Sequence, residues 1–309
     1  MQPSNLQTFK LGLIGYPLSH SLSPKIHTAA LQSCGLEGDY SLYSIPPDDR
    51  QDLKDLLNRV RCSELHGLNV TIPHKQNVIP FLDELTLTAK SIGAVNTIYL
   101  RDNKLTGDNT DATGFLTDLK SFLAKSSSPN RAERSKARSK REEELEMREK
   151  TALVLGAGGS ARAVVYALVN DGWDVTIAAR RMEQANELAK QFEKIKIIEF
   201  NEFNLTTFQL PGFQLIVNTT PLGMSPNIDQ SPWPENIPLP KNAAIYDLVY
   251  NPGETKLVRD ARLQGLQATT GLGMLIEQAA LAFELWTSCN PSREILQASL
   301  EQSLISNSN

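Results

Sequence analysis

The sequence predicts an α/β protein made of two domains. Short apolar runs that end at glycine, proline or polar residues alternate with segments of helical periodicity along most of the chain. A glycine-rich turn joins a predicted strand to a predicted helix at Gly156. A strongly charged segment divides the chain, and 309 residues suffice for two domains.

The first half is expected to alternate strands and helices. Its predicted strands are Phe9–Gly15, Tyr40–Ile45 and Gly67–Ile72, and then a hairpin of Ala94–Leu100 and Asn103–Gly107. Its predicted helices begin at Pro24, cover Asp48–Val60 and start again at Asp111. Proline suits the first position of a helix, and Asp111 is expected to act as an N-cap.

The segment 126–150 differs in composition from the rest of the chain. Between Arg131 and Lys150 it holds eight basic and six acidic residues and almost no apolar ones. Mixed charge of this kind is typical of a solvated helix or a disordered insertion. A partner-binding or anion-binding arm is the alternative.

The second half predicts a parallel sheet that is covered on both faces, because its strands are short and almost wholly apolar. The predicted strands are Ala152–Leu155, Trp173–Ala178, Ile195–Ile198, Leu215–Asn218 and Ala244–Asp247. The predicted helices are Ser160–Asn170, Met182–Phe192 and Leu275–Trp286.

Composition excludes several classes of protein. A net charge of −4 leaves no basic excess for nucleic acid or an anionic membrane. No apolar run approaches the roughly 20 residues that span a bilayer, and the N-terminus does not resemble a secretion signal. The cysteines Cys34, Cys62 and Cys289 are odd in number and widely spaced, which predicts free thiols and no zinc knuckle. A cytoplasmic protein is therefore expected.

The glycine turn carries the clearest chemical signal. Gly156 allows a tight turn, Gly158 lets the backbone approach a pyrophosphate, and Ala161 lets the helix pack closely on the strand. The N–H groups at the start of the helix, from Gly159 and Ser160, favour a phosphate. The pattern predicts a Rossmann-type dinucleotide-binding domain, with an ordinary strand-to-helix turn as the alternative.

The residues after the next strand favour NADP over NAD. An NAD site usually places a carboxylate there to bind the ribose hydroxyls. This chain has Ala179, Arg180 and Arg181 instead, and guanidinium groups bind phosphate bidentately. The alternative is that one arginine only caps the sheet edge.

Four polar motifs follow or end predicted strands of the first half, where open α/β sheets bind ligands. They are Ser19–Pro24, Asn69–Lys75, Gly93–Thr97 and Gly107–Asp111. Their hydroxyls, amides, ammonium and carboxylate suit a small molecule that carries several hydroxyls and a carboxylate.

In combination and order, these motifs resemble the shikimate dehydrogenase family over nearly the whole chain. The resemblance also covers the glycine turn and the later segments Asn218–Met224, Asp247–Pro252 and Gly271–Leu275 with Gln278. It implies an N-terminal substrate domain and an NADP-binding Rossmann domain with a cleft between them. The expected boundaries are 1–110, completed by 271–309, and 111–270.

The resemblance implies an enzyme of chorismate and aromatic amino-acid biosynthesis that reduces 3-dehydroshikimate to shikimate with NADPH. Lys75 and Asp111 are the implied catalytic pair. The implied substrate-binding residues are Ser21, Ser23, Asn69, Thr71, Asn96, Asp111, Tyr250 and Gln278. The implied cofactor-binding residues are Gly156, Ala157, Gly158, Gly159, Ser160, Ala161, Ala179, Arg180, Arg181, Thr219, Leu248 and Gly271.

The implied reduction explains why the catalytic pair consists of an ammonium and a carboxylate. Hydride arrival at a ketone carbon builds negative charge on oxygen, which a positioned ammonium such as Lys75 can stabilise and protonate. Asp111 would hold that ammonium, and which of the two transfers the proton stays open. His20 and His74 are expected to be solvent-facing or satisfied loop histidines.

The chain departs from the family pattern at the phosphate site. Asn-Arg-Thr is frequent where Ala179, Arg180 and Arg181 stand, and Gln184 replaces a second frequent arginine. A quinate/shikimate dehydrogenase and a non-catalytic NADP(H)-binding regulator are the alternative functions. A monomer or a homodimer is expected.

Overall fold

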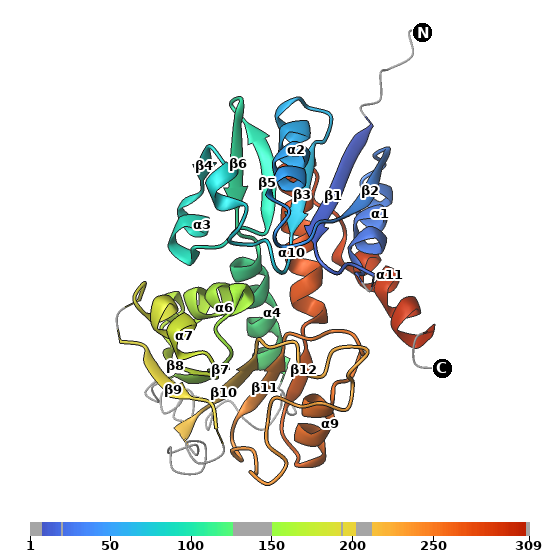
Figure 1. Cartoon of the computed structure of the whole chain (residues 1–309). Coiled ribbons are helices and arrows are strands. Elements are labelled where there is room, and N and C mark those ends of the chain that lie inside the picture. Colours follow the sequence, from blue (N-terminus) through green and yellow to red (C-terminus); the bar gives the residue numbers. More distant parts are fainter. Residues whose placement is uncertain (1–7, 20, 126–149, 193, 202–211, 307–309) are drawn as a thin grey trace, which may run out of the picture. The chain divides into compact units, whose positions relative to one another are not determined.

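The computed structural model describes residues 8–19, 21–125, 150–192, 194–201 and 212–306 (Figure 1). Its internal contacts divide the chain into two compact units, residues 1–114 with 273–309 and residues 115–272. Each unit contains a six-stranded sheet, which confirms the predicted α/β class. The predicted charged segment, apart from Lys150, and His20 lie outside the described residues.

The sheet of the first unit is mixed. Its strands are β1 (Phe9–Gly15), β2 (Gly38–Ser44), β3 (Gly67–Val70), β4 (Glu84–Leu85), β5 (Thr97–Arg101) and β6 (Lys104–Asp108), in the order β2-β1-β3-β5-β6-β4. β1 runs parallel to β2 and β3, whereas β5 is antiparallel to β3 and β6. The predicted hairpin is confirmed, and the positive φ angles of Asp102 and Asn103 make its tight turn.

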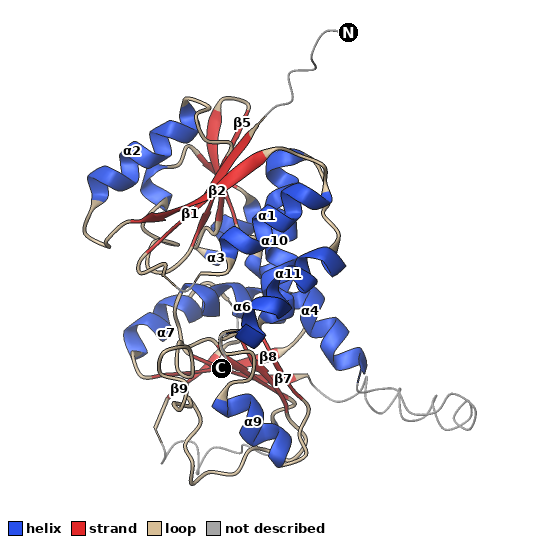
Figure 2. Ribbon diagram, turned by 90° about the vertical axis from the view of Figure 1, so that its right-hand side faces the viewer, coloured by secondary structure: helices blue, strands red, loops and turns tan. Residues whose placement is uncertain are grey.

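Helices cover both faces of this sheet. They are α1 (Ser23–Ser33), α2 (Arg50–Arg61), α3 (Leu87–Ile92), the start of α4 (Asp111–Lys125), α10 (Leu272–Thr287) and α11 (Arg293–Ser306), with a 3-10 turn at Ile79–Phe81. Figure 2 shows α2 on one face and α1, α10 and α11 on the other.

Side chains of β3 alternate between these two faces. Leu68 and Val70 join the buried cluster that includes the leucines of α2. Gly67 faces α10, because a Cβ atom at that position would lie 2.2 Å from the Trp286 ring. Asn69, two residues on, therefore points to the face that α1 and α10 cover.

The sheet of the second unit is wholly parallel. Its strands are β7 (Thr151–Leu155), β8 (Asp174–Ala179), β9 (Lys196–Glu199), β10 (Leu215–Asn218), β11 (Ala244–Asp247) and β12 (Ala268–Thr270), in the order β12-β11-β10-β7-β8-β9. Each neighbouring pair is parallel. Counted from β7, this is the 3-2-1-4-5-6 order of a Rossmann fold.

Both faces of the parallel sheet are covered, as its apolar strands predict. Figure 1 shows α6 (Gly159–Asn170) and α7 (Met182–Ala189) on one side, with α9 (Lys256–Leu263) on the other. Ile245 of β11 clusters with Leu257 of α9. The next side chain, Tyr246, packs edge-on against Phe115 and Phe122 of α4.

Two predictions about local structure are wrong. Cys34 and Cys289 form a disulfide rather than free thiols, whereas Cys62 is free and exposed. The two half-cystines are 255 residues apart in sequence, but the fold brings the end of α1 to the segment after α10, with 6.4 Å between their Cα atoms. The wide spacing of the cysteines in the sequence therefore did not show how close Cys34 and Cys289 lie in the fold.

Asp111 does not cap α4, because the helix already includes it. The side-chain oxygen of Asn109 accepts from the backbone N–H groups of Asp111 and Ala112, at 3.1 and 3.4 Å. The Asp111 carboxylate is bonded to other side chains instead. No helix in the described part of the chain is long and apolar enough to cross a membrane.

Candidate active site

Polar residues of the first unit gather at one edge of its sheet. Ser21 follows β1 and Lys75 follows β3, and these parallel strands end at the same edge. β5 is antiparallel to β3, so Asn96, just before β5, lies at that edge too. β6 is antiparallel to β5, which brings Asp111, just after β6, to the same place. Topology thus explains why four separated motifs form one site.

Lys75 and Asp111 form a buried ion pair. The Lys75 ammonium donates to Asp111 Oδ2 at 2.6 Å, and the two side chains are 11% and 7% exposed. A buried charge is tolerated only where a partner and further hydrogen bonds compensate the lost hydration. Asp111 Oδ1 supplies such a bond by accepting from the Asn96 side chain at 2.9 Å. The predicted pair therefore exists as a preformed unit.

Asn96 is the hub of the site. Its Nδ2 donates to Thr110 Oγ1 at 2.9 Å as well as to Asp111, and it approaches Gln278 Oε1 at 3.4 Å. Its Oδ1 accepts from the Thr110 backbone N–H and the Thr97 hydroxyl. These bonds fix the amide orientation, and Thr97 and Thr110 are supporting residues that were not singled out within their motifs.

The remaining predicted substrate residues differ in burial and in whether their polar atoms already have hydrogen-bond partners in the protein. Ser21 and Ser23 are half-buried, and Ser21 Oγ accepts from the Ser23 backbone N–H at 3.2 Å. Thr71 is also half-buried. Asn69 is buried, and both ends of its amide already have protein partners. Tyr250 follows β11 in the second unit and is not part of this cluster within the first unit.

His74 is buried, and only one of its two ring nitrogens has a hydrogen-bond partner in the described part of the chain, so it is neither the solvent-facing nor the satisfied histidine that was expected. Its side chain is fully buried, and Nε2–H donates to the Ile45 carbonyl at 2.7 Å. The adjacent Lys75 carbonyl accepts from the Val95 N–H at 2.7 Å. Both bonds tie the loop after β3 to its surroundings and so limit where the Lys75 side chain can lie.

The glycine turn of the second unit has the geometry of a phosphate cradle. Gly156 has a φ of 106°, and a Cβ atom there would lie 2.7 Å from Thr219 Oγ1. Gly158 precedes α6, is exposed, and has open space where a Cβ atom would stand. Ala161 is fully buried against the sheet. The start of α6 therefore offers exposed N–H groups to an anion, as dinucleotide binding requires.

The other predicted cofactor residues lie at the same edge of this parallel sheet. Arg180 and Arg181 follow β8 and are exposed, while Ala179 turns into the core. Thr219, Leu248 and Gly271 directly follow β10, β11 and β12. A Cβ atom on Gly271 would lie 2.3 Å from the Leu248 carbonyl oxygen, so this close approach requires glycine. The residues present fit an NADP(H) molecule laid across the strand ends.

Asp247 was not singled out from the sequence as a site residue, although it ends β11 beside these loops. Its fully buried carboxylate accepts from Asn218 Nδ2, the Val249 N–H and the Thr255 hydroxyl, at 2.8, 3.0 and 2.7 Å. Burial raises the pKa of Asp247 to about 6, although these hydrogen bonds act to lower it. The carboxylate joins the loops after β10 and β11 to the start of α9.

Asp247 should make the stability of the second unit depend on pH. Its folded-state pKa lies above the ordinary 3.8, so its contribution is fully present below about pH 4 and is lost as the pH rises through about 6. In Asp247→Asn, the amide oxygen can still accept from Asn218 Nδ2 and the Val249 N–H, the amide nitrogen can donate to the Thr255 hydroxyl instead of accepting from it, and the group cannot ionise. Between about pH 4 and 7 the unfolding free energy of the variant should gain about 3 kcal/mol on that of the parent.

Urea denaturation of both proteins at a series of pH values measures this difference. Asp174→Asn, which removes an exposed carboxylate at the start of β8, controls for the loss of one negative charge. A difference between parent and Asp247→Asn that stays constant with pH would contradict the prediction.

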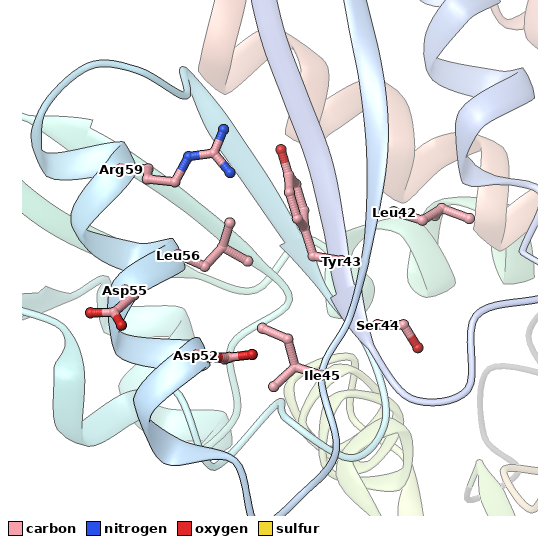
Figure 3. A pocket seen from close by; sticks show the side chains of 8 residues that line it. All are labelled: Leu42, Tyr43, Ser44, Ile45, Asp52, Asp55, Leu56 and Arg59. Carbon is pink, nitrogen blue, oxygen red and sulfur yellow. The ribbon is translucent and has the colours of Figure 1, made fainter.

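A pocket of about 570 Å³ lies apart from these residues, between β2 and α2 (Figure 3). Its lining consists of Leu42, Tyr43, Ser44, Ile45, Asp52, Asp55, Leu56 and Arg59. The Arg59 guanidinium stacks over the Tyr43 ring at 5.6 Å. None of these residues belongs to a predicted motif, so the candidate site rests on the hydrogen-bonded cluster rather than on this hollow.

Comparison with known proteins points to one family. Family models described as the shikimate dehydrogenase substrate binding domain, shikimate / quinate 5-dehydrogenase and the shikimate 5'-dehydrogenase C-terminal domain match residues 13–98, 136–217 and 271–301. The chain is 38% identical to the NADP⁺-dependent shikimate dehydrogenase of Carboxydothermus hydrogenoformans, over 96% of this chain and 98% of that protein.

Similar solved structures come from the same family. The shikimate 5-dehydrogenase of Thermus thermophilus in complex with NADP(H) and shikimate matches with a TM-score of 0.79 at 35% identity, over 96% of this chain and all of that one. The enzyme of Listeria monocytogenes in complex with shikimate and NAD matches with a TM-score of 0.77 at 29% identity, over 95% and 96%. The second complex shows that a similar fold also accepts NAD.

Proposed function

The chain belongs to the shikimate dehydrogenase family, and we propose that it interconverts 3-dehydroshikimate and shikimate with NADP(H). The observation that carries this proposal is the buried Lys75–Asp111 pair inside a ring of amides and hydroxyls. The first unit would be the substrate domain and the second the NADP-binding domain.

Each part of the substrate has suitable partners. The Ser21 and Ser23 hydroxyls are half-buried at the start of α1 and would bind the carboxylate. Asn69, Thr71, Asn96 and Gln278 would bind or orient the ring hydroxyls together with Asp111. Tyr250, from the second unit, would complete the substrate set. Uncharged donors suit these groups, because they hydrogen bond the substrate without requiring that a further charge be desolvated.

NADP(H) would lie on the second unit. The turn from Gly156 to Ala161 would hold the pyrophosphate, and Arg180 with Arg181 would hold the 2′-phosphate. Thr219, Leu248 and Gly271 would support the other end of the molecule. When bound, NADPH supplies the hydride for the carbonyl carbon, and NADP⁺ accepts it in reverse.

The chain itself contributes proton chemistry and charge. In the reductive direction, the Lys75 ammonium faces the carbonyl oxygen, stabilises its developing negative charge and donates a proton to it. In the oxidative direction, the pair takes that proton from the substrate hydroxyl. Asp111 keeps the ammonium in place, and Asn96 keeps Asp111 in place.

A two-substrate, two-cofactor assay tests this proposal. Shikimate should reduce NADP⁺ with a higher kcat/KM than quinate does, and NADP⁺ should be a better acceptor than NAD⁺. Quinate carries one more hydroxyl, which would need room and a partner in a site built from fixed amides. Equal efficiency with quinate and NAD⁺ would favour a quinate/shikimate dehydrogenase. Binding of both ligands without turnover would favour a regulator.

A further inference from the structure

Tyr40 and His27 form a buried aromatic pair beneath the candidate active site. Their rings are parallel, with centroids 4.4 Å apart and an interplanar angle of 4°. Tyr40 comes from β2 and His27 from α1, and Trp286 of α10 lies 5.3 Å from the His27 ring. His27 is 1% exposed, and burial lowers its pKa to about 3, so the imidazole is neutral.

Tyr40 of this pair bonds directly to Asn69. Its hydroxyl donates to Asn69 Oδ1 at 2.8 Å, and the His27 ring stacks on the Tyr40 ring. Asn69 Nδ2 donates in turn to the backbone carbonyl oxygen of Asn96 at 3.2 Å. An asparagine amide can flip by rotation about χ2, which exchanges its oxygen and its nitrogen. A donor to the oxygen together with an acceptor for the nitrogen selects one of the two orientations.

The hydrogen bonds continue to the reacting groups. Asn96 donates to Asp111 Oδ1 at 2.9 Å, and Asp111 Oδ2 accepts from Lys75 at 2.6 Å. Over the whole residue, Tyr40 is 9% exposed, and Asn69, Asn96, Asp111 and Lys75 are between 2% and 8% exposed. Water therefore has little access with which to replace a missing link, and each buried bond is costly to lose.

We propose that Tyr40, supported by the stacked His27 ring, is a positioning residue that fixes the Asn69 amide and, through Asn96, the Lys75–Asp111 pair. This inference rests on the proposed function for its kinetic consequence. It gives the buried aromatic pair a role in catalysis that operates through Asn69 rather than through contact with the reacting atoms.

Tyr40→Phe tests the proposal, because it keeps the stacked ring and removes only the hydroxyl. The kcat for shikimate should fall about tenfold, which corresponds to the loss of one buried hydrogen bond, while the KM for NADP⁺ should stay within about twofold. Tyr99→Phe on β5 is the matched control and should change none of these quantities.

A double-mutant cycle separates positioning from general stability. If Tyr40 acts through Asn69, Tyr40→Phe should have no further effect on kcat in an Asn69→Ala background. An undiminished further loss in that background, or a lower Tm with kcat unchanged, would overturn the proposal. Should Tyr40→Phe fail to fold, His27→Leu removes the ring that stacks on Tyr40 and should lower kcat while the KM for NADP⁺ stays within about twofold.

Side-chain amide NMR of the ligand-free protein provides a readout without turnover. The Asn69 and Asn96 Nδ2 resonances should move or broaden in Tyr40→Phe and stay in place in Tyr99→Phe. Absence of turnover in the parent protein would defeat the proposed function, whereas unchanged amide resonances in Tyr40→Phe would defeat the positioning role.

Discussion

Replacement of Lys75 by methionine is expected to lower kcat by about 10²- to 10⁴-fold, the usual contribution of a positioned proton donor. Methionine keeps most of the buried aliphatic stem and removes the ammonium that donates to Asp111. The KM for shikimate should change little, because the ammonium matters most once charge develops on the oxygen. Steady-state kinetics at saturating NADP⁺ measure both quantities, and a near-normal kcat would refute the role of Lys75.

The same substitution should lower stability, and a second substitution should restore it. Lys75→Met leaves the Asp111 carboxylate buried without its cation, which costs about 3 kcal/mol. Adding Asp111→Asn removes that charge, so the double variant should regain most of the lost unfolding free energy while its kcat stays low. Lys90→Met, at an exposed lysine of α3, should change neither stability nor kcat. Restored activity in the double variant would show that the ammonium acts only by neutralising Asp111.

Strands were predictable where apolar runs have clear ends. Phe9–Gly15 and Ala244–Asp247 have the same bounds in sequence and structure, because glycine or a buried carboxylate closes each run. β12 escaped prediction because Ala268–Thr270 is short and polar, and only its pairing with β11 makes it a strand. Local sequence cannot reveal a strand that its neighbour defines.

Three helices were missed, namely Leu87–Ile92, which has only six residues, Lys256–Leu263 and Arg293–Ser306. Lys256–Leu263 carries a usable signal, because Thr255 accepts from the Val258 N–H as an N-cap and Leu257 and Val258 are buried. Arg293–Ser306 is largely polar and buries few leucines, among them Leu296 and Leu300, so its pattern resembles that of an exposed segment. Its contacts with α1 come from tertiary packing.

Site residues that belong to sequence motifs could be predicted. Site residues that only tertiary packing brings together could not. Resemblance predicted Lys75 and Asp111, and strand topology explains why they meet. Tyr40, His27 and Asp247 were not predicted as parts of the site, because their partners lie on other strands and helices. The Cys34–Cys289 bond belongs to the same class, since spacing in sequence does not encode distance in the fold.

The double variant Arg180→Ala/Arg181→Ala is expected to lose its preference for NADPH. Arg180 and Arg181 are exposed beyond β8, and neither forms an ion pair with another residue in the described part of the chain, so both are available to a 2′-phosphate. A hydrogen bond to a charged group contributes about 1.5–3 kcal/mol, so the loss of two should raise the KM for NADPH by at least about 10²-fold. The KM for NADH should stay nearly constant, because NADH has no phosphate there.

The single variants divide this effect between the two arginines. The buried side chain of Ala179 cannot reach a phosphate, so Arg181 should carry a substantial share and Arg181→Ala alone should raise the KM for NADPH. Lys196→Ala is the matched control, since this exposed lysine begins β9 and therefore lies at the opposite edge of the parallel sheet. Adenosine 2′-phosphate should inhibit the parent and the control competitively against NADPH but not the double variant. Equal inhibition of all three would place the phosphate contact elsewhere in the second unit.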